Sequence, residues 1–524
     1  MPPSENPSIP TFPVRDASAL YRASQVRALD RRAIEEFWIP SATLMARAGK
    51  MAFQTLRRYW PKINRIAIVS GLGNNAGDGY VVARLAHDAG FRVRVFQVGE
   101  ASRLQGDALL AYQALLATGT TPLPMTVGCL EDGGDEVIVD ALLGTGLKGE
   151  VRPPFREAIA EINRRAVPTL AVDVPSGLCT DTGSVLGAAV RATVTVTFVG
   201  NKVGLFTGEG PAYAGHVVFS DLDIPPEVYL PLVPTTQCLD LKALPYWLPQ
   251  RHRTAHKGHF GHVLVVGGAP GYAGAARLAA EAAARVGAGL VSLATHPDHA
   301  AQIAAMRPEV MVHGVTKGDD LALLLERATV LVLGPGLSCG AWGLSLWKAA
   351  LATKRPTVLD ADALNLLAEH PKEREQRDWV LTPHPGEAAR LLGCSVADIQ
   401  ADRCATLGSL VQRYGGTWVL KGAGTLVGSD RLSVPGLCPV ANPGMASGGM
   451  GDVLAGVLGG LMAQGVPAQE AACLGVCLHA EAATCASIAG ERGLLASDLM
   501  PHLRTLVNPS PSVRKKKKSN KQHK

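Results

Sequence analysis

Apolar positions in the first 220 residues follow two spacings, one typical of helices and one of buried strands. At residues 23–37, apolar side chains recur at helical spacing, which predicts an amphipathic helix. Short apolar runs separated by helical patterns follow, as expected for a parallel sheet covered on both faces. The predicted elements are helices Ala23–Phe37 and Ala42–Tyr59 (capped by Ser41), strand Arg65–Ser70, turn Gly71–Asp78, helix Gly79–Ala89, strand Arg92–Val98, helix Gly106–Ala117, strand Glu136–Asp140, helix Pro154–Arg164 and strand Thr169–Asp173.

The same rhythm starts again near residue 262, after a proline-rich stretch without clear periodicity. We therefore predict an α/β fold with two three-layer αβα domains, at residues 1–224 and 255–507. A linker is expected at 225–254 and a disordered basic tail at 508–524. The predicted elements of the second half are strands His262–Gly267, Leu290–Ala294, Thr329–Leu333 and Thr357–Leu359, a hairpin through Gly428–Asp430, and helices Ala275–Val286, Ala446–Met462 and Gln469–Ile488.

Composition and charge exclude several classes of protein. The chain has 524 residues, 47% hydrophobic and 18% charged, which indicates a globular protein with more than one core. The net charge is +6, but the last residues, 514–524, contain one arginine and six lysines. Without that tail the charge is about −1, so the body offers no general nucleic-acid-binding surface.

The chain shows no pattern of a signal peptide, and no apolar stretch that we interpret as a membrane span. Ten cysteines are scattered without a Cys-x-x-Cys pair, which fits reduced thiols. We therefore expect a cytoplasmic protein with no membrane span and no specific nucleic-acid partner. The sequence leaves open whether it forms a homo-oligomer.

Three polar loops follow predicted strands of the first half. They read Gly71–Gly79 (GLGNNAGDG), Asp140–Gly146 (DALLGTG, running on to Lys148 and Glu150) and Asp173–Gly177 (DVPSG). Ligands of parallel sheets bind at the carboxyl ends of the strands, so these loops are expected to meet in one crevice. Their carboxylates, amides and hydroxyls suit a cation as well as a phosphate.

The stretch Asn442–Asp452 (NPGMASGGMGD) contains four glycines and precedes a helical run. A glycine-rich turn that opens a helix presents backbone N–H groups at the positive end of the helix dipole, which favours phosphate. A carboxylate at this position suits a general base or a substrate-orienting group in phosphoryl transfer, and Asp452 is our candidate. A second glycine-rich turn, Lys421–Thr425, follows another predicted strand.

The first loop also matches Gly-x-Gly-x-x-Ala, a weak signal of a dinucleotide-binding dehydrogenase. Asp78 argues against that interpretation, because its charge lies where a pyrophosphate would bind. Two alternatives remain. One is an NAD-dependent dehydrogenase fused to a sugar or vitamin kinase, and the other is a non-catalytic nucleotide-binding protein.

The motifs NNAGD (74–78), DALLGTG (140–146), DVPSG (173–177) and NKVGL (201–205) resemble, in order and spacing, the YjeF N-terminal domain, a family of NAD(P)H-hydrate epimerases with a Rossmann-like sheet. The resemblance implies interconversion of the R and S hydrates at nicotinamide C6, by loss and return of the hydroxyl or by ring opening. We expect Asp173 as the acid/base group, with Lys148 as its partner. The resemblance implies a potassium ion near Asn75, Asp140 and Ser176, and substrate contacts from Asn74, Asn75, Ala76, Gly77, Asp78, Gly144, Thr145, Gly146, Leu147, Lys148, Gly149, Glu150 and Asp173.

The second half resembles the ADP-dependent NAD(P)H-hydrate dehydratases, which have a ribokinase-like fold. The motifs that carry this resemblance are TPHPGE (382–387), KGAGT (421–425), NPGM (442–445) and GMGDVLAG (449–456). With both halves included, the chain is similar to bifunctional NAD(P)H-hydrate repair enzymes. The resemblance implies catalysis by Asp452, substrate contacts from Ala275, Gly336, His384 and Asp452, and ADP contacts from Lys421, Gly422, Ala423, Gly424, Thr425, Asn442, Pro443, Gly444, Met445, Ala446, Ser447, Gly448, Gly449, Met450 and Gly451.

Hydrates of NADH and NADPH, together with ADP, are therefore the expected small-molecule partners. Mg²⁺ is expected to accompany ADP, with Glu387 as a ligand through water. His252, His256 and His259 show no metal-binding spacing.

Overall fold

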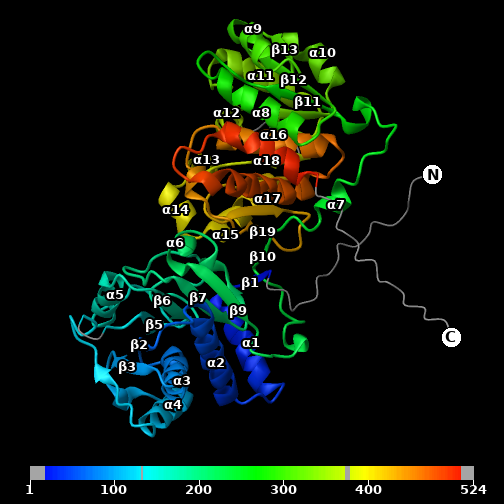
Figure 1. Ribbon diagram of the computed structural model, residues 1–524. Helices are drawn as coiled ribbons and strands as arrows, with labels where there is room; N and C mark the ends of the chain where they lie inside the picture. Colours follow the sequence, from blue (N-terminus) through cyan, green and yellow to red (C-terminus); the bar gives the residue numbers. More distant parts are fainter. Residues whose placement is uncertain (1–17, 132–133, 372–377, 509–524) are drawn as a thin grey trace, which may run out of the picture. The chain divides into compact units, whose positions relative to one another are not determined.

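A computed structural model describes residues 18–131, 134–371 and 378–508 of the chain (Figure 1). The predicted basic tail, apart from Asn508, lies outside the described residues. The structure contains two compact units. Unit 1 comprises Met1–Leu239 and Pro383–Ala441, and unit 2 comprises Asp240–Thr382 and Asn442–Lys524. Both contain parallel strands alternating with helices, so the predicted α/β class is confirmed, while the domain boundaries at 224 and 254 stay a prediction.

The main sheet of unit 1 has seven strands, and all of its neighbouring pairs are parallel. Its central strands are almost fully buried, as their apolar sequences require. In spatial order the strands are β4 (Leu123–Pro124), β3 (Arg92–Gln97), β2 (Arg65–Ser70), β5 (Val137–Ala141), β6 (Thr169–Val172), β7 (Val194–Phe198) and β9 (His216–Ser220).

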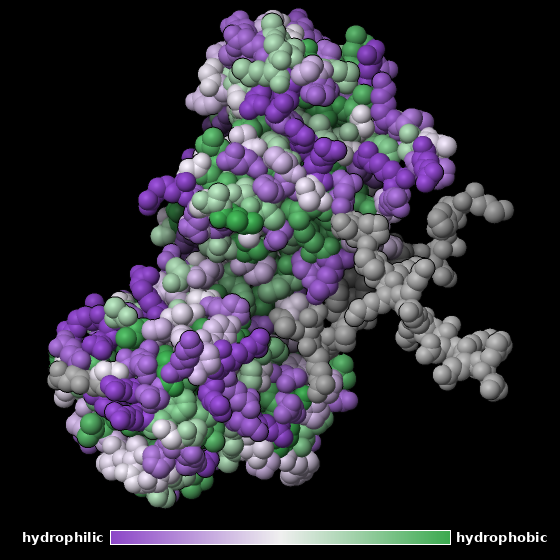
Figure 2. Space-filling view, viewed as in Figure 1, coloured by the Kyte–Doolittle hydropathy of each residue, from purple (hydrophilic) through white to green (hydrophobic). Residues whose placement is uncertain are grey.

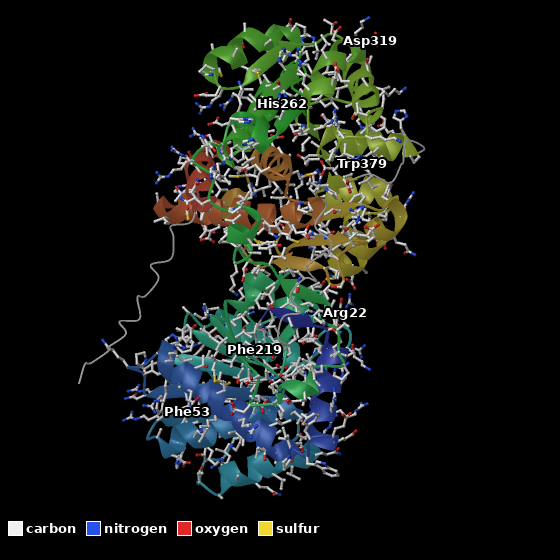
Figure 3. All side chains as sticks on the ribbon, turned by 90° about the vertical axis from the view of Figure 1, so that its right-hand side faces the viewer. Arg22, Phe53, Phe219, His262, Asp319 and Trp379 are labelled. Carbon is white, nitrogen blue, oxygen red and sulfur yellow. The ribbon has the colours of Figure 1, made fainter. Side chains whose placement is uncertain are left out.

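Helices cover both faces of this sheet, because alternate residues of each strand point to opposite sides. Ile66 and Ile68 of β2 belong to one core cluster, and Ala67 and Val69 to another. Phe53 belongs to the first cluster and contacts Phe91 edge to face; it is labelled in Figure 3. The first cluster takes side chains from α1 (Ala23–Glu35), α2 (Ser41–Tyr59), α3 (Asn74–Asp88) and α4 (Gly106–Leu116), and the second from α5 (Phe155–Arg164).

Three predicted helix starts are wrong, and one of them belongs to α16 (Met450–Ala463), which begins at Met450 rather than at Ala446. Helix α3 begins at Asn74 rather than Gly79, with Gly73 as its N-cap, so the polar sequence NNAGD forms the first helical turn and not a loop. Polar residues and glycine are tolerated there because the first turn of a helix has free N–H groups. Helix α2 begins at Ser41 itself, after Pro40, and shows no side-chain cap.

A smaller set of strands in unit 1 joins segments far apart in the sequence. Antiparallel β17, β18 and β19 continue through β10 and β1 to β8. Strand β10 lies within the segment predicted as a linker. The bounds are β1 (Ala19–Tyr21), β8 (Asn201–Lys202), β10 (Thr236–Cys238), β17 (Thr417–Leu420), β18 (Thr425–Ser429) and β19 (Gly436–Cys438), with helices α13 (Pro385–Leu392), α14 (Val396–Ala401) and α15 (Arg403–Tyr414) nearby in sequence.

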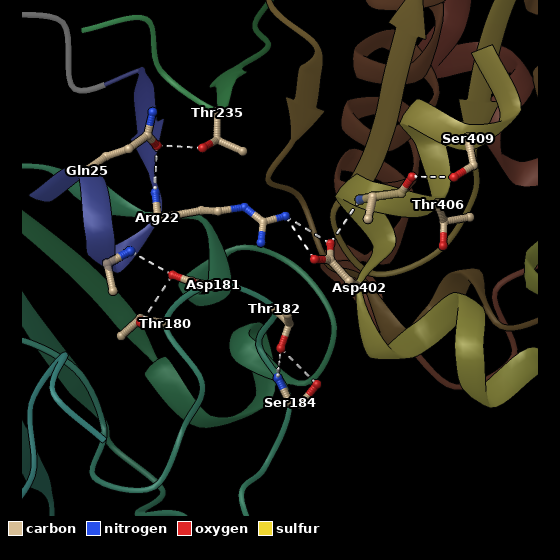
Figure 4. Close-up of polar contacts among 12 residues, drawn as sticks. Arg22, Gln25, Thr180, Asp181, Thr182, Ser184, Thr235, Asp402, Thr406 and Ser409 are labelled. Carbon is tan, nitrogen blue, oxygen red and sulfur yellow. Dashed lines mark hydrogen bonds and ion pairs between the residues drawn. The ribbon is translucent and has the colours of Figure 1, made fainter. Parts of the chain in front are cut away.

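Polar contacts also connect the start of α1 with the start of α15 (Figure 4). Arg22 directly precedes α1, and its guanidinium donates to both carboxylate oxygens of Asp402, at 3.1 and 2.9 Å. Asp402 also caps α15 by accepting from the Ala405 N–H at 2.9 Å. Residues near positions 22 and 402 therefore belong to one compact body.

Unit 2 contains six parallel strands, in the spatial order β13, β12, β11, β14, β15 and β16. His262 begins β11 and Trp379 begins β16; both are labelled in Figure 3. The strands are β11 (His262–Val266), β12 (Leu290–Thr295), β13 (Met311–Gly314), β14 (Val330–Leu333), β15 (Thr357–Leu359) and β16 (Trp379–Leu381), and the helices include α8 (Ala273–Arg285), α9 (Pro297–Met306), α11 (Ala341–Leu351), α12 (Asp362–Glu369), α16 (Met450–Ala463), α17 (Ala468–Ala486) and α18 (Leu499–Leu506).

Helices α8 and α16 pack backbone to backbone. A Cβ atom added at Gly456 would lie 2.1 Å from the Ala279 carbonyl oxygen, so only glycine fits there. Within the described residues, one helical segment, 468–489, is long and apolar enough to cross a membrane by length and composition. It includes α17, and 61% of its apolar window is buried inside the structure. The face that shows α17 in Figure 1 mixes polar and apolar side chains in Figure 2, and no span is established.

Candidate functional sites

A cavity of about 620 Å³ in unit 1 collects residues from all three polar loops. The carboxyl ends of β2, β5 and β6 lead into these loops, so the cavity lies where a parallel sheet is expected to bind ligands. Of the residues predicted to contact the epimerase substrate, those that line it are Asn74, Asn75, Asp78, Gly144, Thr145, Gly146, Leu147, Lys148 and Asp173.

The remaining predicted contacts lie elsewhere. Ala76 is fully buried in the core on the inner side of α3. A Cβ added at Gly77 would lie 2.6 Å from the Met45 sulfur, so this glycine permits packing of α2 against α3. Gly149 and Glu150 are exposed and do not line the cavity.

Two of the three predicted potassium ligands are in direct contact. Asp140, fully buried at the end of β5, accepts from the Ser176 hydroxyl at 2.6 Å and from the Ser176 N–H at 2.8 Å. Burial raises the pKa of Asp140 to about 6, against the opposing effect of the Ser176 hydrogen bonds. The Ser176 hydroxyl oxygen also accepts from the Leu143 N–H at 2.9 Å.

The third predicted ligand, Asn75, carries the observation that fits a cation. Its side-chain oxygen and nitrogen are both buried, and neither has a hydrogen-bond partner among the described residues. Such groups are rare in proteins because an unpaired buried amide costs about 1–3 kcal/mol. A carboxylate, a hydroxyl and an unpaired amide oxygen around one loop junction form a donor set that suits K⁺.

Four charged side chains from four elements line the same cavity: Asp30 of α1, Asp78 of α3, Asp173 after β6, and Lys202 of β8. The Lys202 ammonium group donates to Asp173 Oδ1 at 2.5 Å, to the Phe198 carbonyl at 2.8 Å and to Thr197 Oγ1 at 3.0 Å. Lys148, which we expected beside Asp173, has an exposed side chain on the loop. The ion pair of Asp173 is therefore with Lys202.

Two carboxyl groups of this cluster, those of Asp78 and Asp30, have a raised pKa. Burial raises the pKa of Asp78 well above its usual range, and the charges of Asp173 and Asp30 raise it further. Burial also raises the pKa of Asp30 to about 6, although the nearby Lys202 opposes that shift. Asp173 itself has a left-handed backbone, with φ of 67°, which is uncommon for a residue other than glycine.

The glycine-rich turn Lys421–Thr425 of unit 1 surrounds a buried guanidinium. Arg403, the first residue of α15, is 2% exposed, and its Nη2 donates to the carbonyls of Leu420, Lys421 and Gly424 at 3.2, 3.2 and 3.4 Å. Its Nε donates to Thr207 Oγ1 at 3.2 Å. Burial lowers the pKa of Arg403 to about 10.

His384 and Glu387 form the start of helix α13. The His384 Nδ1 accepts from the N–H groups of Gly386 and Glu387 at 3.0 and 3.4 Å, while Glu387 Oε2 accepts from the His384 N–H at 2.7 Å. Glu387 is 5% exposed and lies 3.8 Å from the Lys421 ammonium. These contacts give both residues a capping role, while the water-mediated contact of Glu387 with Mg²⁺ stays a prediction. The substrate contact of His384 stays a prediction.

The glycine-rich stretch Asn442–Asp452 lies in unit 2 and opens helix α16. Gly449 is the N-cap with φ of 90°, and Asp452 lies in the first turn. Asn442 holds the preceding turn, because its Oδ1 accepts from the Gly444 N–H at 2.9 Å and its Nδ2 donates to Ser487 at 3.0 Å. A Cβ added at Gly448 would meet open space. The arrangement presents the first-turn N–H groups of α16 as the sequence predicts.

Ala275 and Gly336 lie close to each other in unit 2. A Cβ added at Gly336 would lie 3.3 Å from the Ala275 Cβ and 2.7 Å from the Tyr272 carbonyl oxygen. Gly336 has φ of 60°, so both space and backbone conformation favour glycine.

Comparison with known proteins covers both halves. A family model described as YjeF-related protein N-terminus matches residues 41–204, and one described as NAD(P)H-hydrate dehydratase matches residues 263–504. The chain is 49% identical over 493 residues to the bifunctional NAD(P)H-hydrate repair enzyme Nnr of Coxiella burnetii, covering 94% of this chain and 100% of that protein. The chain belongs to the family of bifunctional NAD(P)H-hydrate repair enzymes.

Other members of the repair-enzyme family are similarly close. The protein of the same name from Escherichia coli is 42% identical over 499 residues, covering 95% of each chain. A crystal structure of an ADP/ATP-dependent NAD(P)H-hydrate dehydratase from Bacillus subtilis, co-crystallized with ATP and Mg²⁺, covers 51% of this chain and 97% of that chain, at 26% identity and a TM-score of 0.45. The family resemblance read from the motifs is confirmed.

Three notable residues had no assigned role before the structure of this repair-enzyme chain was known. Lys202 was visible only as part of the NKVGL motif, and its partner Asp173 is 29 residues away in sequence. Asp30 lies on a helix whose apolar stripe indicated only packing. Arg403 follows no motif, and its acceptors come from β17, the following turn and the first half of the chain. Only the fold could reveal these contacts.

Proposed function

We propose that this protein repairs hydrated NADH and NADPH. The N-terminal half epimerises the R and S hydrates, and the C-terminal half dehydrates the S form to NAD(P)H, converting ADP to AMP and phosphate. One observation carries the proposal: the similarity to bifunctional repair enzymes runs through both halves and over the full length of the relative from Coxiella burnetii. The expected compartment is the cytoplasm.

The cavity of unit 1 supports the epimerase activity. Epimerisation at C6 needs a proton donor and a proton acceptor beside that carbon, and carboxyl groups of differing acidity line this cavity. K⁺ would be held by Asp140, Ser176 and Asn75, where it would supply a fixed positive charge. Asn74, Gly144 and the neighbouring loop residues would contact the substrate.

The dehydratase activity would use the two glycine-rich turns. Each of these turns, Lys421–Thr425 and Gly448–Gly451, would offer backbone N–H groups to a phosphate. Asp452 would orient the C6 hydroxyl of the S hydrate and accept its proton as the terminal phosphoryl group transfers to it. Phosphate is a better leaving group than water, so transfer makes elimination to the dihydropyridine feasible. Mg²⁺ would accompany the nucleotide and neutralise its phosphate charge.

The test is a repair assay with the full chain. With a mixture of hydrated NADH epimers and ADP, we expect the dihydronicotinamide absorbance to recover almost completely, and without nucleotide we expect no recovery. Recovery of the S epimer alone would show that the first half lacks epimerase activity. Phosphorylation of a sugar or vitamin without hydrate repair would overturn the proposal in favour of a kinase.

Potassium is expected to stabilise unit 1. A ligand that binds only the native state at ten times its dissociation constant adds about 1.4 kcal/mol to the free energy of unfolding. The melting temperature should therefore be higher in KCl than in choline chloride of equal ionic strength, and Ser176→Ala should remove the difference. The control Ser102→Ala changes an exposed hydroxyl and should keep it. A difference of full size in Ser176→Ala would contradict the assigned site.

A further inference from the structure

The cavity of unit 1 is lined by three carboxyl groups and by the buried ammonium group of Lys202. Asp30, Asp78 and Asp173 all line it, and the electrostatic coupling of Asp78 with Asp30, Asp173 and Lys202 shows that the four groups form one cluster. Asp78 is 9% exposed and Lys202 is 1% exposed. Three ionised carboxylates around one ammonium group would leave a buried net charge of about −2, which is unfavourable in a site of low polarity. The carboxyl groups therefore cannot be equivalent.

The hydrogen bonds of Lys202 show which of the three carboxyl groups forms an ion pair with it. An ammonium group has three donors. Those of Lys202 go to Asp173, Thr197 and Phe198, so among the residues that the structure describes Asp173 is its one carboxylate partner through a direct hydrogen bond. Thr197 and Phe198 belong to β7, which holds the ammonium group at the end of the sheet. The charge of Lys202 lowers the pKa of Asp78 without a direct hydrogen bond. Burial raises that pKa, and it is the larger of the two effects.

We propose that protonated Asp78 and ionised Asp173 are the acid and the base of the epimerase centre, and that Lys202 is the positioning residue that holds Asp173 ionised. The proposal rests on the function proposed above. Two carboxyl groups whose surroundings favour opposite protonation states are the arrangement that acid–base catalysis requires.

The chemistry balances for this pair. The hydrate is a hemiaminal, in which C6 carries both the hydroxyl and the ring nitrogen N1. Asp173 takes the hydroxyl proton, the C6–O bond becomes a carbonyl, and the C6–N1 bond breaks as its electron pair moves to N1, which takes the proton of Asp78. Rotation about C5–C6 turns the other face of the aldehyde to N1. Reversal of the proton transfers then closes the ring with the opposite configuration and restores both groups.

The other charged groups around the cavity contribute to the pH dependence of the epimerisation rate. Asp30 faces the pair from α1, and Arg27, Asp107 and Lys148 also line the cavity. The base must be ionised, so the rate falls at acidic pH, and the acid must be protonated, so the rate falls again above the pKa of Asp78. The wild-type profile of kcat/KM for epimerisation is expected to be bell-shaped.

The test follows conversion of the isolated R hydrate to the S hydrate by chromatography, without nucleotide and after subtraction of the uncatalysed rate. Asp78→Asn, which cannot donate a proton, is expected to lower kcat at least 100-fold. Asp88→Asn is the matched control on the same helix, because its side chain is 54% exposed, and it should stay within twofold of wild type. Lys202→Gln takes away the ammonium group that donates to Asp173, so it should lower kcat at least tenfold with little change in KM, a split that a purely structural role would not give.

The outcomes separate the two proposals. Wild-type protein that dehydrates the S hydrate with ADP but never interconverts epimers would overturn the epimerase function itself. Wild-type protein that epimerises while Asp78→Asn keeps more than a third of its rate would overturn the acid–base pair alone. If Asp78→Asn fails to fold, as judged by its melting curve, the wild-type profile decides, since a profile without an alkaline limb contradicts an acid at this position.

Discussion

Replacing Asp452 with asparagine is expected to lower kcat for ADP-dependent dehydration by about 10²- to 10⁴-fold, the usual contribution of a positioned acid–base group. The amide keeps the size of the side chain but cannot accept the proton of the C6 hydroxyl. Epimerisation should be unchanged, because Asp452 lies in α16 of unit 2 and the epimerase cavity is lined by unit 1 alone. Dehydration is measured from the pure S hydrate by recovery of dihydronicotinamide absorbance.

Glu491→Gln provides the control for this experiment. It removes a carboxylate from an exposed position of the same unit and should keep both activities. Loss of both activities in a folded Asp452→Asn protein would contradict separate sites. Full dehydratase activity in that variant would show that Asp452 only opens the helix.

Replacing Arg403 with methionine is expected to raise the KM for ADP at least tenfold and to destabilise unit 1. Its guanidinium donates to the carbonyls of Leu420, Lys421 and Gly424, which therefore point toward Arg403. Because the C=O and N–H of one peptide group point in opposite directions, the N–H groups that follow these carbonyls point away from Arg403. Without the donor, the two buried acceptors, the carbonyls of Leu420 and Gly424, each lose a hydrogen bond worth about 1 kcal/mol. A loss of about 2 kcal/mol would lower the melting temperature by about 4–8 °C. Steady-state kinetics and thermal melting measure the two effects.

Two further variants separate charge from geometry. Arg403→Lys keeps the positive charge but loses the fork of donors, so we expect most of the increase in KM to remain. Thr207→Val removes the acceptor that the first half of the chain contributes and the 3.4 Å hydrogen bond from the same hydroxyl to the Ala423 carbonyl, but it keeps the guanidinium and should leave KM nearly unchanged. An unchanged KM in Arg403→Met, with normal melting, would exclude a role of this side chain in positioning the turn.

The sequence predicted the parts of the site that depend on local pattern and on the rule for strand ends. Asn74, Gly144 and Asp173 were expected at one crevice because they follow parallel strands, and they do line one cavity. The turn before α16 could also be predicted from the sequence, since four glycines and a helical run are local signals. Family motifs then indicated the activity, which pattern alone could not.

Long-range contacts were not predictable in the same way. The partner of Asp173 had to be one of several lysines, and nothing local distinguishes Lys202 from Lys148. The start of α3 was missed because asparagine and glycine usually indicate a turn, whereas here Gly73 caps a helix. Strand β10 was read as linker because only three residues pair, and tertiary neighbours rather than propensity make them a strand.

The pairing of β10 with β19 has a consequence for how the nascent chain matures. Gln237 of β10 lies opposite Gly436 of β19, so one edge of β10 has no neighbour until nearly 200 further residues have left the ribosome. At about 5–20 residues per second, that wait lasts about 10 to 40 seconds. An open strand edge invites pairing with other chains. Early protection by a chaperone should therefore matter more for the yield of this protein than for one whose bodies are contiguous in sequence.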